Sequence, residues 1–187
     1  MSEYYFVREA SSIPRYIFSD KFSDAVPNSA FTYPSKEIDL YVDLKPKDEY
    51  LFPDSFDLPS YSIIKSLFEN INLKNIYGVN WIEIRLIDKK IENFFMLQIA
   101  NEIKIIDRVK SVTQEIMDFG TEDETIFGIE KLVLDERVMN DIPRDKRLIV
   151  TDPAWHEVFF HKTIVEEIEK ISLVSTKFIP AEGYSEF

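Results

Sequence analysis

A dense β-forming run at Asn93–Ile99 constrains the fold of this chain more than any other stretch. The run reads NFFMLQI, so large side chains fall at both the odd and the even positions. Successive side chains of a strand point to opposite faces of its sheet. We therefore expect an interior strand here, with both of its faces covered by other elements.

Short strands are predicted along the rest of the chain from alternating or dense apolar runs. Trp81–Asp88 alternates apolar with charged side chains, which is typical of a strand with one face in water. The opening run at Tyr4–Arg8 is expected to be an edge strand. Four more strands are predicted in this way, at Ile38–Val42, Ile105–Ser111, Ile126–Leu134 and Leu148–Val150.

Two helices are predicted from apolar stripes at helical spacing. The first begins at Ser60 and carries Ile63, Ile64, Leu67, Phe68 and Ile71, and the second carries Ile164, Val165, Ile168 and Ile171. Few helices among many short strands predict an α+β fold, with a mostly antiparallel or mixed β-sheet flanked by a few helices.

The length of the chain, 187 residues, suits one domain that spans residues 1–187. A looser N-terminal lobe over residues 1–60 beside a C-terminal lobe over 61–187 remains an alternative. A chain of this size buries on the order of 70% of its unfolded surface, so its core needs neither disulfides nor a metal ion. Because the chain has no cysteine, disulfides, thiol nucleophiles and zinc–thiolate sites are excluded.

The location of the protein is predicted from two further features. The chain opens with Met1-Ser2-Glu3-Tyr4 and lacks an apolar leader. No stretch approaches the roughly 18 uninterrupted apolar residues that a membrane span requires. We therefore expect a cytoplasmic protein that does not contact the membrane.

The net charge of −12 is concentrated toward the C-terminus. Residues 115–141 contain nine Asp and Glu against only Lys131 and Arg137. Such a surface repels nucleic acids and anionic lipids, so neither is an expected partner. A basic protein is the natural electrostatic partner.

The motifs that contain potentially catalytic side chains do not predict a catalytic site. His156 and His161 resemble a zinc-binding helix motif, but they are five residues apart and cannot share one metal ion. We expect His156 in a turn and His161 at the start of the following helix. Asp54 with Glu102 and Lys104 matches a magnesium nuclease pattern only loosely, and the surrounding acidity opposes a DNA substrate.

The four glycines are too sparse for a phosphate-binding loop, and no Gly-x-Ser-x-Gly elbow occurs. The sequence therefore predicts no cofactor, no metal ion and no enzymatic activity.

Three segments combine aromatic and acidic side chains outside the predicted core. The first is the acidic loop after Met117, the second is the proline-bounded segment Tyr50–Asp57, and the third surrounds Trp155. Aromatic anchors and nearby charges are typical of protein-binding surfaces. The candidate partner-binding residues are Asp118, Phe119, Glu122, Asp123, Glu124, Phe52, Asp54 and Trp155.

The order of motifs in the last hundred residues also bears on function. The aromatic run at Asn93 is followed by Asp107-Arg108-Val109-Lys110-Ser111, a strand with an acidic turn at Ile126–Glu136, and a strand, helix and strand that end at Pro180. This order resembles bacterial polymorphic-toxin immunity protein family 11. His161 stands where that family tends to have Ser, and the Gly expected after the closing helix is missing.

The resemblance implies an immunity protein that binds and neutralises a cognate bacterial toxin in the cytosol by stoichiometric protein–protein interaction. A toxin domain with a basic surface fits the charge of the chain. Two alternatives stay open at this point. One is an enzyme, a hydrolase or toxin-modifying protein with an unrecognised carboxylate site, and the other is an adaptor or structural protein of a phage or secretion system.

Overall fold

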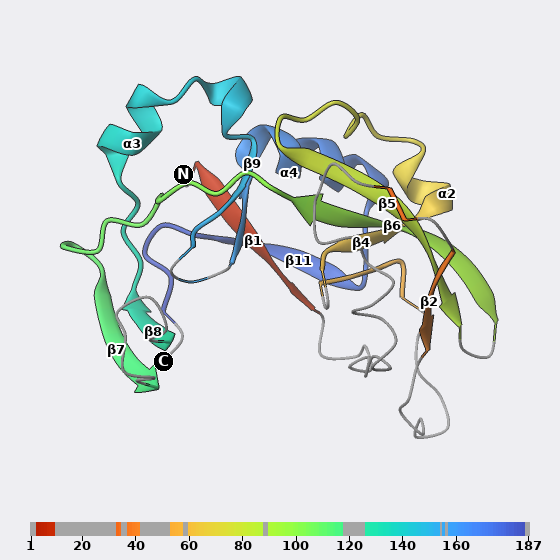
Figure 1. Ribbon diagram of the computed structural model, residues 1–187, viewed down its shortest axis with the longest axis horizontal. Helices are drawn as coiled ribbons and strands as arrows, with labels where there is room; N and C mark the ends of the chain where they lie inside the picture. The colour runs from red at the N-terminus through yellow and green to blue at the C-terminus, as the bar shows by residue number, and fades with distance from the viewer. Residues whose placement is uncertain are drawn as a thin grey trace.

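The computed structural model describes residues 3–9, 33–34, 37–41, 53–57, 60–87, 90–117, 126–153, 155 and 157–185, and it has an α+β fold (Figure 1). The predicted fold class is confirmed: three β-sheets, most of whose strand pairs are antiparallel, are flanked by short helices. The strands are β1 (Tyr4–Glu9), β2 (Ile38–Tyr41), β3 (Ser55–Phe56), β4 (Ser62–Ile64), β5 (Val79–Ile87), β6 (Ile91–Ile99), β7 (Val112–Met117), β8 (Ile126–Lys131), β9 (Ile149–Thr151), β10 (Val158–His161) and β11 (Thr176–Pro180). The α-helices are α2 (Lys65–Phe68), α3 (Glu136–Asp141) and α4 (Lys162–Ile168), and the 3-10 helices are η1 (Arg144–Lys146) and η2 (Glu169–Ile171).

The aromatic run forms the central strand of a five-stranded sheet with the order β2-β5-β6-β4-β3. β6 pairs antiparallel with β5 on one side and with β4 on the other. Phe94 and Met96 are buried on one face and Leu97 on the other, which confirms the prediction of a strand covered on both faces. β2 pairs parallel with β5, so the sheet is mixed.

A four-stranded sheet with the order β11-β1-β10-β9 brings the first strand between two C-terminal strands. The predicted edge position of Tyr4–Arg8 is therefore wrong. Tyr4 pairs with His161 on β10, and residues Tyr5–Glu9 pair with β11. The buried side chains of Tyr4, Phe6 and Val7 explain the difference, because a strand with apolar groups on both faces suits an interior place.

The helix predicted from Ser60 is only partly correct. Residues Ser62–Ile64 form β4, and the helix α2 is a single turn from Lys65 to Phe68. Ile63 pairs with Phe95 and Ile64 with Phe94, so β-branched side chains meet aromatic ones across the strands. These cross-strand contacts outweigh a helical pattern that begins with two β-branched residues.

The segment Ile105–Ser111 is not the predicted strand. Only Ile106 forms an isolated bridge, with Leu134, and residues 108–110 form a turn. Two elements here were not predicted: β7, which pairs with β8 in a two-stranded ribbon, and the helix α3. α3 begins after Asp135, whose carboxylate accepts the N–H groups of Arg137 and Val138.

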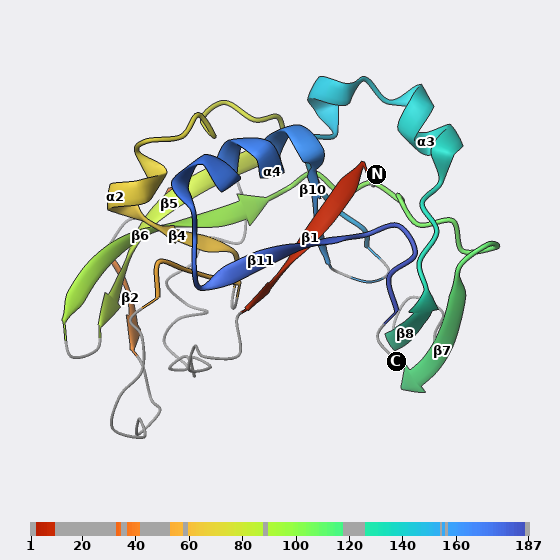
Figure 2. The ribbon, with the colours of Figure 1, turned by 180° about the vertical axis from the view of Figure 1, so that it is seen from behind.

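Three clusters of buried side chains fill the molecule. The first lies beneath α2 and α4, which cover the same side of the two larger sheets (Figure 2). The second lies beside β1, β9 and β10 under residues 103–106 and 132–139, and the third lies on β2, β5 and β6. The first cluster includes Val7, Leu97 and Phe160, so it joins residues of both sheets.

None of the helices in the described part of the chain has the length and apolar character needed to cross a membrane.

Candidate partner-binding site

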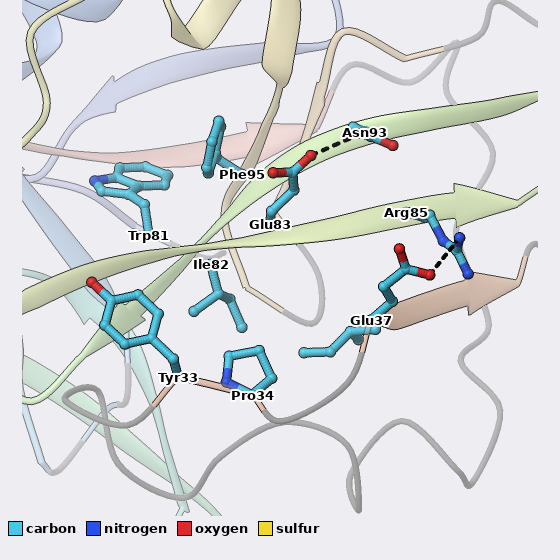
Figure 3. A pocket seen from close by; sticks show the side chains of 10 residues that line it. Tyr33, Pro34, Glu37, Trp81, Ile82, Glu83, Arg85, Asn93 and Phe95 are labelled. Atoms are coloured by element: carbon cyan, nitrogen blue, oxygen red, sulfur yellow. Dashed lines mark hydrogen bonds and ion pairs between the residues drawn. The ribbon is translucent and has the colours of Figure 1, made fainter.

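An open groove of about 530 Å³ lies at the edge of the five-stranded sheet. Ile38, the first residue of β2, pairs with Ile84, so the start of β5 extends beyond β2. Figure 3 shows Tyr33 and Pro34 on one side of this part of β5 and Trp81 on the other. The groove therefore follows the start of β5, between the segment that precedes β2 and the ring of Trp81.

Alternation along β5 directs its polar side chains to the groove. Trp81, Glu83 and Arg85 share one face of the strand, as expected for residues two apart. On β6, Phe95 is opposite Glu83 and Asn93 is opposite Arg85. The groove thus receives aromatic and charged side chains from two paired strands, which hold them in fixed positions.

Arg85 is held by two carboxylates. Its Nη1 lies 2.6 Å from Oε2 of Glu37, and its Nε and Nη2 donate to the two carboxylate oxygens of Asp39 at 2.7 and 3.0 Å. The hydrogen bonds with Asp39 raise the pKa of the Arg85 guanidinium. A planar guanidinium matched to a carboxylate at two points has a fixed orientation, so Arg85 is rigid as well as charged.

Glu83 is the second charged centre of the groove. Its Oε1 accepts from Nζ of Lys65 at 2.9 Å and from Nδ2 of Asn93 at 2.8 Å. The hydrogen bond with Glu83 raises the pKa of Lys65. Lys65 and Arg85 are therefore each paired with at least one carboxylate.

Aromatic rings supply the apolar surface of the groove. Tyr33 is 72% exposed, whereas Trp81 and Phe95 are partly buried. The ring of Phe68, on α2, supports both of them, with centroids 4.8 Å from Trp81 and 4.6 Å from Phe95. Nε1 of Trp81 is buried and has no acceptor within the described part of the chain. Rigid rings with one exposed tyrosine are suited to contact with another protein.

A second group of titratable side chains joins β1 to α4. Oε1 of Glu3 lies 2.6 Å from Nη1 of Arg147 and 3.1 Å from Nε2 of His161. Nδ1 of His161 accepts the N–H of Thr163, which fixes the proton of the neutral ring on Nε2. His161 is only 1% exposed, and burial lowers its pKa. Both ring nitrogens of His161 are engaged, so this group ties Glu3, at the start of β1, to β10 and α4.

The prediction that His161 begins the last helix is confirmed, because its side chain caps α4. His156 lies outside the described residues.

The carboxylate of Asp54 binds the backbone before β11. Its Oδ2 accepts the N–H of Val174 at 2.7 Å and its Oδ1 accepts the N–H of Ser175 at 3.0 Å. These bonds hold β3 beside the start of β11, so the carboxylate of Asp54 is occupied within the fold.

Trp155 packs at the border of the second buried cluster. Its ring lies 5.7 Å from that of Phe6, edge to face, and 6.1 Å from those of Phe159 and Tyr184. It is partly buried, so part of its surface stays accessible. Trp155 packs on the second buried cluster, whereas Asp54 contacts the backbone before β11, so the two belong to different regions of the fold.

The other six candidate residues fall outside the part of the chain that the structure describes. They are Phe52, Asp118, Phe119, Glu122, Asp123 and Glu124. Their role in partner binding stays a prediction.

Glu102 and Lys104, from the loose nuclease pattern, are exposed beside β9. Within the described ranges, no set of three or more His, Asp and Glu side chains is placed to hold a metal ion.

The groove itself was not predicted as a site. The sequence does place Glu83 and Arg85 on the wet face of a strand, and this alternation is the signal that leads to the groove. The place of Trp81 at the groove could not be predicted, because it depends on where β2 begins. No protein-family model matches this chain, and no curated protein matches it. The resemblance to immunity protein family 11 therefore stays a prediction.

Proposed function

We propose that this chain is an immunity protein, which binds a cognate bacterial toxin in the cytosol and neutralises it without catalysis. The observation that carries the proposal is the groove on β5 and β6, where rigid aromatic rings and paired charges face outward. Aromatic anchors bordered by charges favour protein binding, whereas carboxylates already paired with cations are poorly suited to acid–base chemistry.

The charge of the groove supports a basic partner. Two carboxylates, those of Glu37 and Glu83, line the groove beside a single cation, that of Arg85. The whole chain also carries a net charge of −12. Opposite charge on a toxin domain would raise the rate of encounter, and contact with Tyr33 and Trp81 would slow dissociation.

The test is co-expression with the toxin domain encoded immediately upstream, with Tyr33→Ala as the groove variant. The matched control is Tyr77→Ala, because Tyr77 is also exposed, at 53%, but packs against Nζ of Lys146 at 4.2 Å, outside the groove. We expect the unaltered chain and Tyr77→Ala to rescue growth and co-purify with the toxin, and Tyr33→Ala to bind more weakly. Rescue without any isolable complex would contradict the proposal and favour an enzyme.

A further inference from the structure

The turn from Asp107 to Ser111 is fixed by its own side chains. Oδ1 of Asp107 accepts the N–H groups of Val109 and Lys110, each at 3.1 Å. The carbonyl of Asp107 accepts the N–H of Ser111 at 2.8 Å. Asp side chains stabilise tight turns in this way, so the conformation of the three middle residues is set before any partner binds.

The two ends of the turn are anchored to one residue of the neighbouring segment, Val133. The N–H of Asp107 donates to the carbonyl of Val133 at 2.9 Å. Oγ of Ser111 accepts the N–H of Val133 at 2.9 Å and donates to its carbonyl at 3.1 Å. Asp107 and Ser111 are buried, so both ends belong to the body of the protein and only the middle projects.

The projecting residues are Arg108, Val109 and Lys110, all of them exposed. Val109 is 94% exposed, more than any other large hydrophobic side chain of the described chain. Val112, 46% exposed, follows directly and pairs across the ribbon with Lys131. A protein with a net charge of −12 thus presents two apolar side chains among three cations at one place.

The charges of these cations are not equally available. Nζ of Lys110 lies 3.1 Å from Oδ2 of Asp107, and Lys110 also lines a shallow groove with Glu136 and Glu182. Arg108 makes no ion pair with any residue that the structure describes. An exposed guanidinium can bind a carboxylate of another molecule at two points.

We propose that this turn is a second contact with the toxin, separate from the groove on β5. Val109 enters an apolar depression of the toxin domain, and Arg108 pairs with a carboxylate at the border of that depression. The inference rests on the proposed function, since the partner is the same toxin. A fixed turn loses little conformational freedom on binding, so these two side chains can contribute more than exposed residues of a flexible loop.

The test measures the dissociation constant of the complex with the upstream toxin domain by biolayer interferometry. The variants are Val109→Asn and Arg108→Glu. The matched controls are Val174→Asn, at a valine that is 61% exposed before β11, and Arg144→Glu, at an exposed arginine of η1 that makes no ion pair within the described ranges. All four side chains are exposed, so thermal unfolding should be unchanged and serves as the check on folding.

We expect each turn variant to raise the dissociation constant by about tenfold, and each control to change it by less than about twofold. If the unaltered chain binds the toxin and the turn variants bind as tightly as the controls, the proposed contact is wrong while the immunity function stands. If the unaltered chain does not bind the toxin at all, both proposals are overturned.

Discussion

Tyr4 and Tyr61 are both buried, but their hydroxyl groups have different surroundings. The hydroxyl of Tyr4 donates to the carbonyl of Arg147 at 3.0 Å and accepts from Nη1 of the same residue at 2.8 Å. The hydroxyl of Tyr61 is buried near the side chain of Thr176, but within the described part of the chain no hydrogen bond of normal geometry reaches it. A buried polar group without a partner costs free energy, whereas a bonded one stabilises the fold.

The pair Tyr61→Phe and Tyr4→Phe tests this difference. We expect Tyr61→Phe to leave the free energy of unfolding unchanged or to raise it by up to about 1 kcal/mol. Tyr4→Phe should lower it by about 1–3 kcal/mol, because it leaves a partly buried guanidinium with one acceptor fewer. Urea denaturation of the three proteins measures both values. An equal loss in the two variants would show that the Tyr61 hydroxyl also has an acceptor.

Two glycines that end or precede secondary-structure elements have positive φ, but only one of them lacks room for a side chain. Comparing them distinguishes the cost of backbone strain from the cost of a steric clash. Gly78, with φ of +67°, lies before β5, and a Cβ added there would be 2.6 Å from Cβ of Asn101. Gly183, with φ of +77°, has no other atom within 4 Å of an added Cβ. Asn101 cannot retreat easily, because its amide donates to the carbonyls of Lys146 and Ile149.

We therefore expect Gly183→Ala to lower the free energy of unfolding by about 1–2 kcal/mol, the cost of a left-handed backbone with a side chain. Gly78→Ala should lower it by a further 1–3 kcal/mol or so, since it adds a collision to the same strain. Thermal denaturation followed by circular dichroism measures the two. Equal losses would mean that the close approach to Asn101 has no energetic consequence.

A strand or helix could be predicted when the interactions that form it are between residues close together in the sequence. The pattern of β5 and β6 is local, and both strands were predicted from it. The turn at Asp107 and the strand β4 depend on partners far along the chain, such as Val133 and Phe95. A stripe of apolar residues at 63–71 satisfies a helix equally well, so the sequence alone could not decide.

In the candidate site, too, only the features formed by neighbouring residues could be predicted. The cap formed by His161 is local and was predicted correctly, since the capping side chain and the N–H group that it accepts, that of Thr163, are two positions apart. The groove needs β2 to pair parallel with β5, which no local pattern indicates. The acidic loop at Asp118–Glu124 stays a prediction from charge alone.

The stability of the whole molecule should fall in acid for two separable reasons. Burial lowers the pKa of His161, so the folded protein binds that proton less readily than the unfolded chain. Burial alone would raise the pKa of Glu3, but its hydrogen bonds and charge interactions with Arg147 and His161 outweigh this and lower it. Stability from both groups is present at neutral pH and is lost as the pH falls.

We expect the free energy of unfolding to begin to fall below about pH 6.5, where the unfolded histidine gains its proton, and to fall further below about pH 4.5, where unfolded glutamate does. His161→Asn, which keeps a capping side chain but cannot ionise, should flatten the upper part of this curve. Glu3→Gln should flatten part of the lower one, since Asp107, Asp135 and Glu167 also have lowered pKa values. An unchanged slope between pH 6.5 and 5 in His161→Asn would contradict this account.

The proposed function depends on whether the whole molecule binds a toxin domain. The direct measurement is isothermal titration calorimetry of the purified chain with the toxin domain proposed as its partner, made inactive so that it can be produced alone. We predict one chain bound per toxin domain, with an affinity that weakens as salt is added, because opposite charges are brought together. A titration without heat of binding at any salt concentration, for two proteins shown to be folded, would contradict the claim.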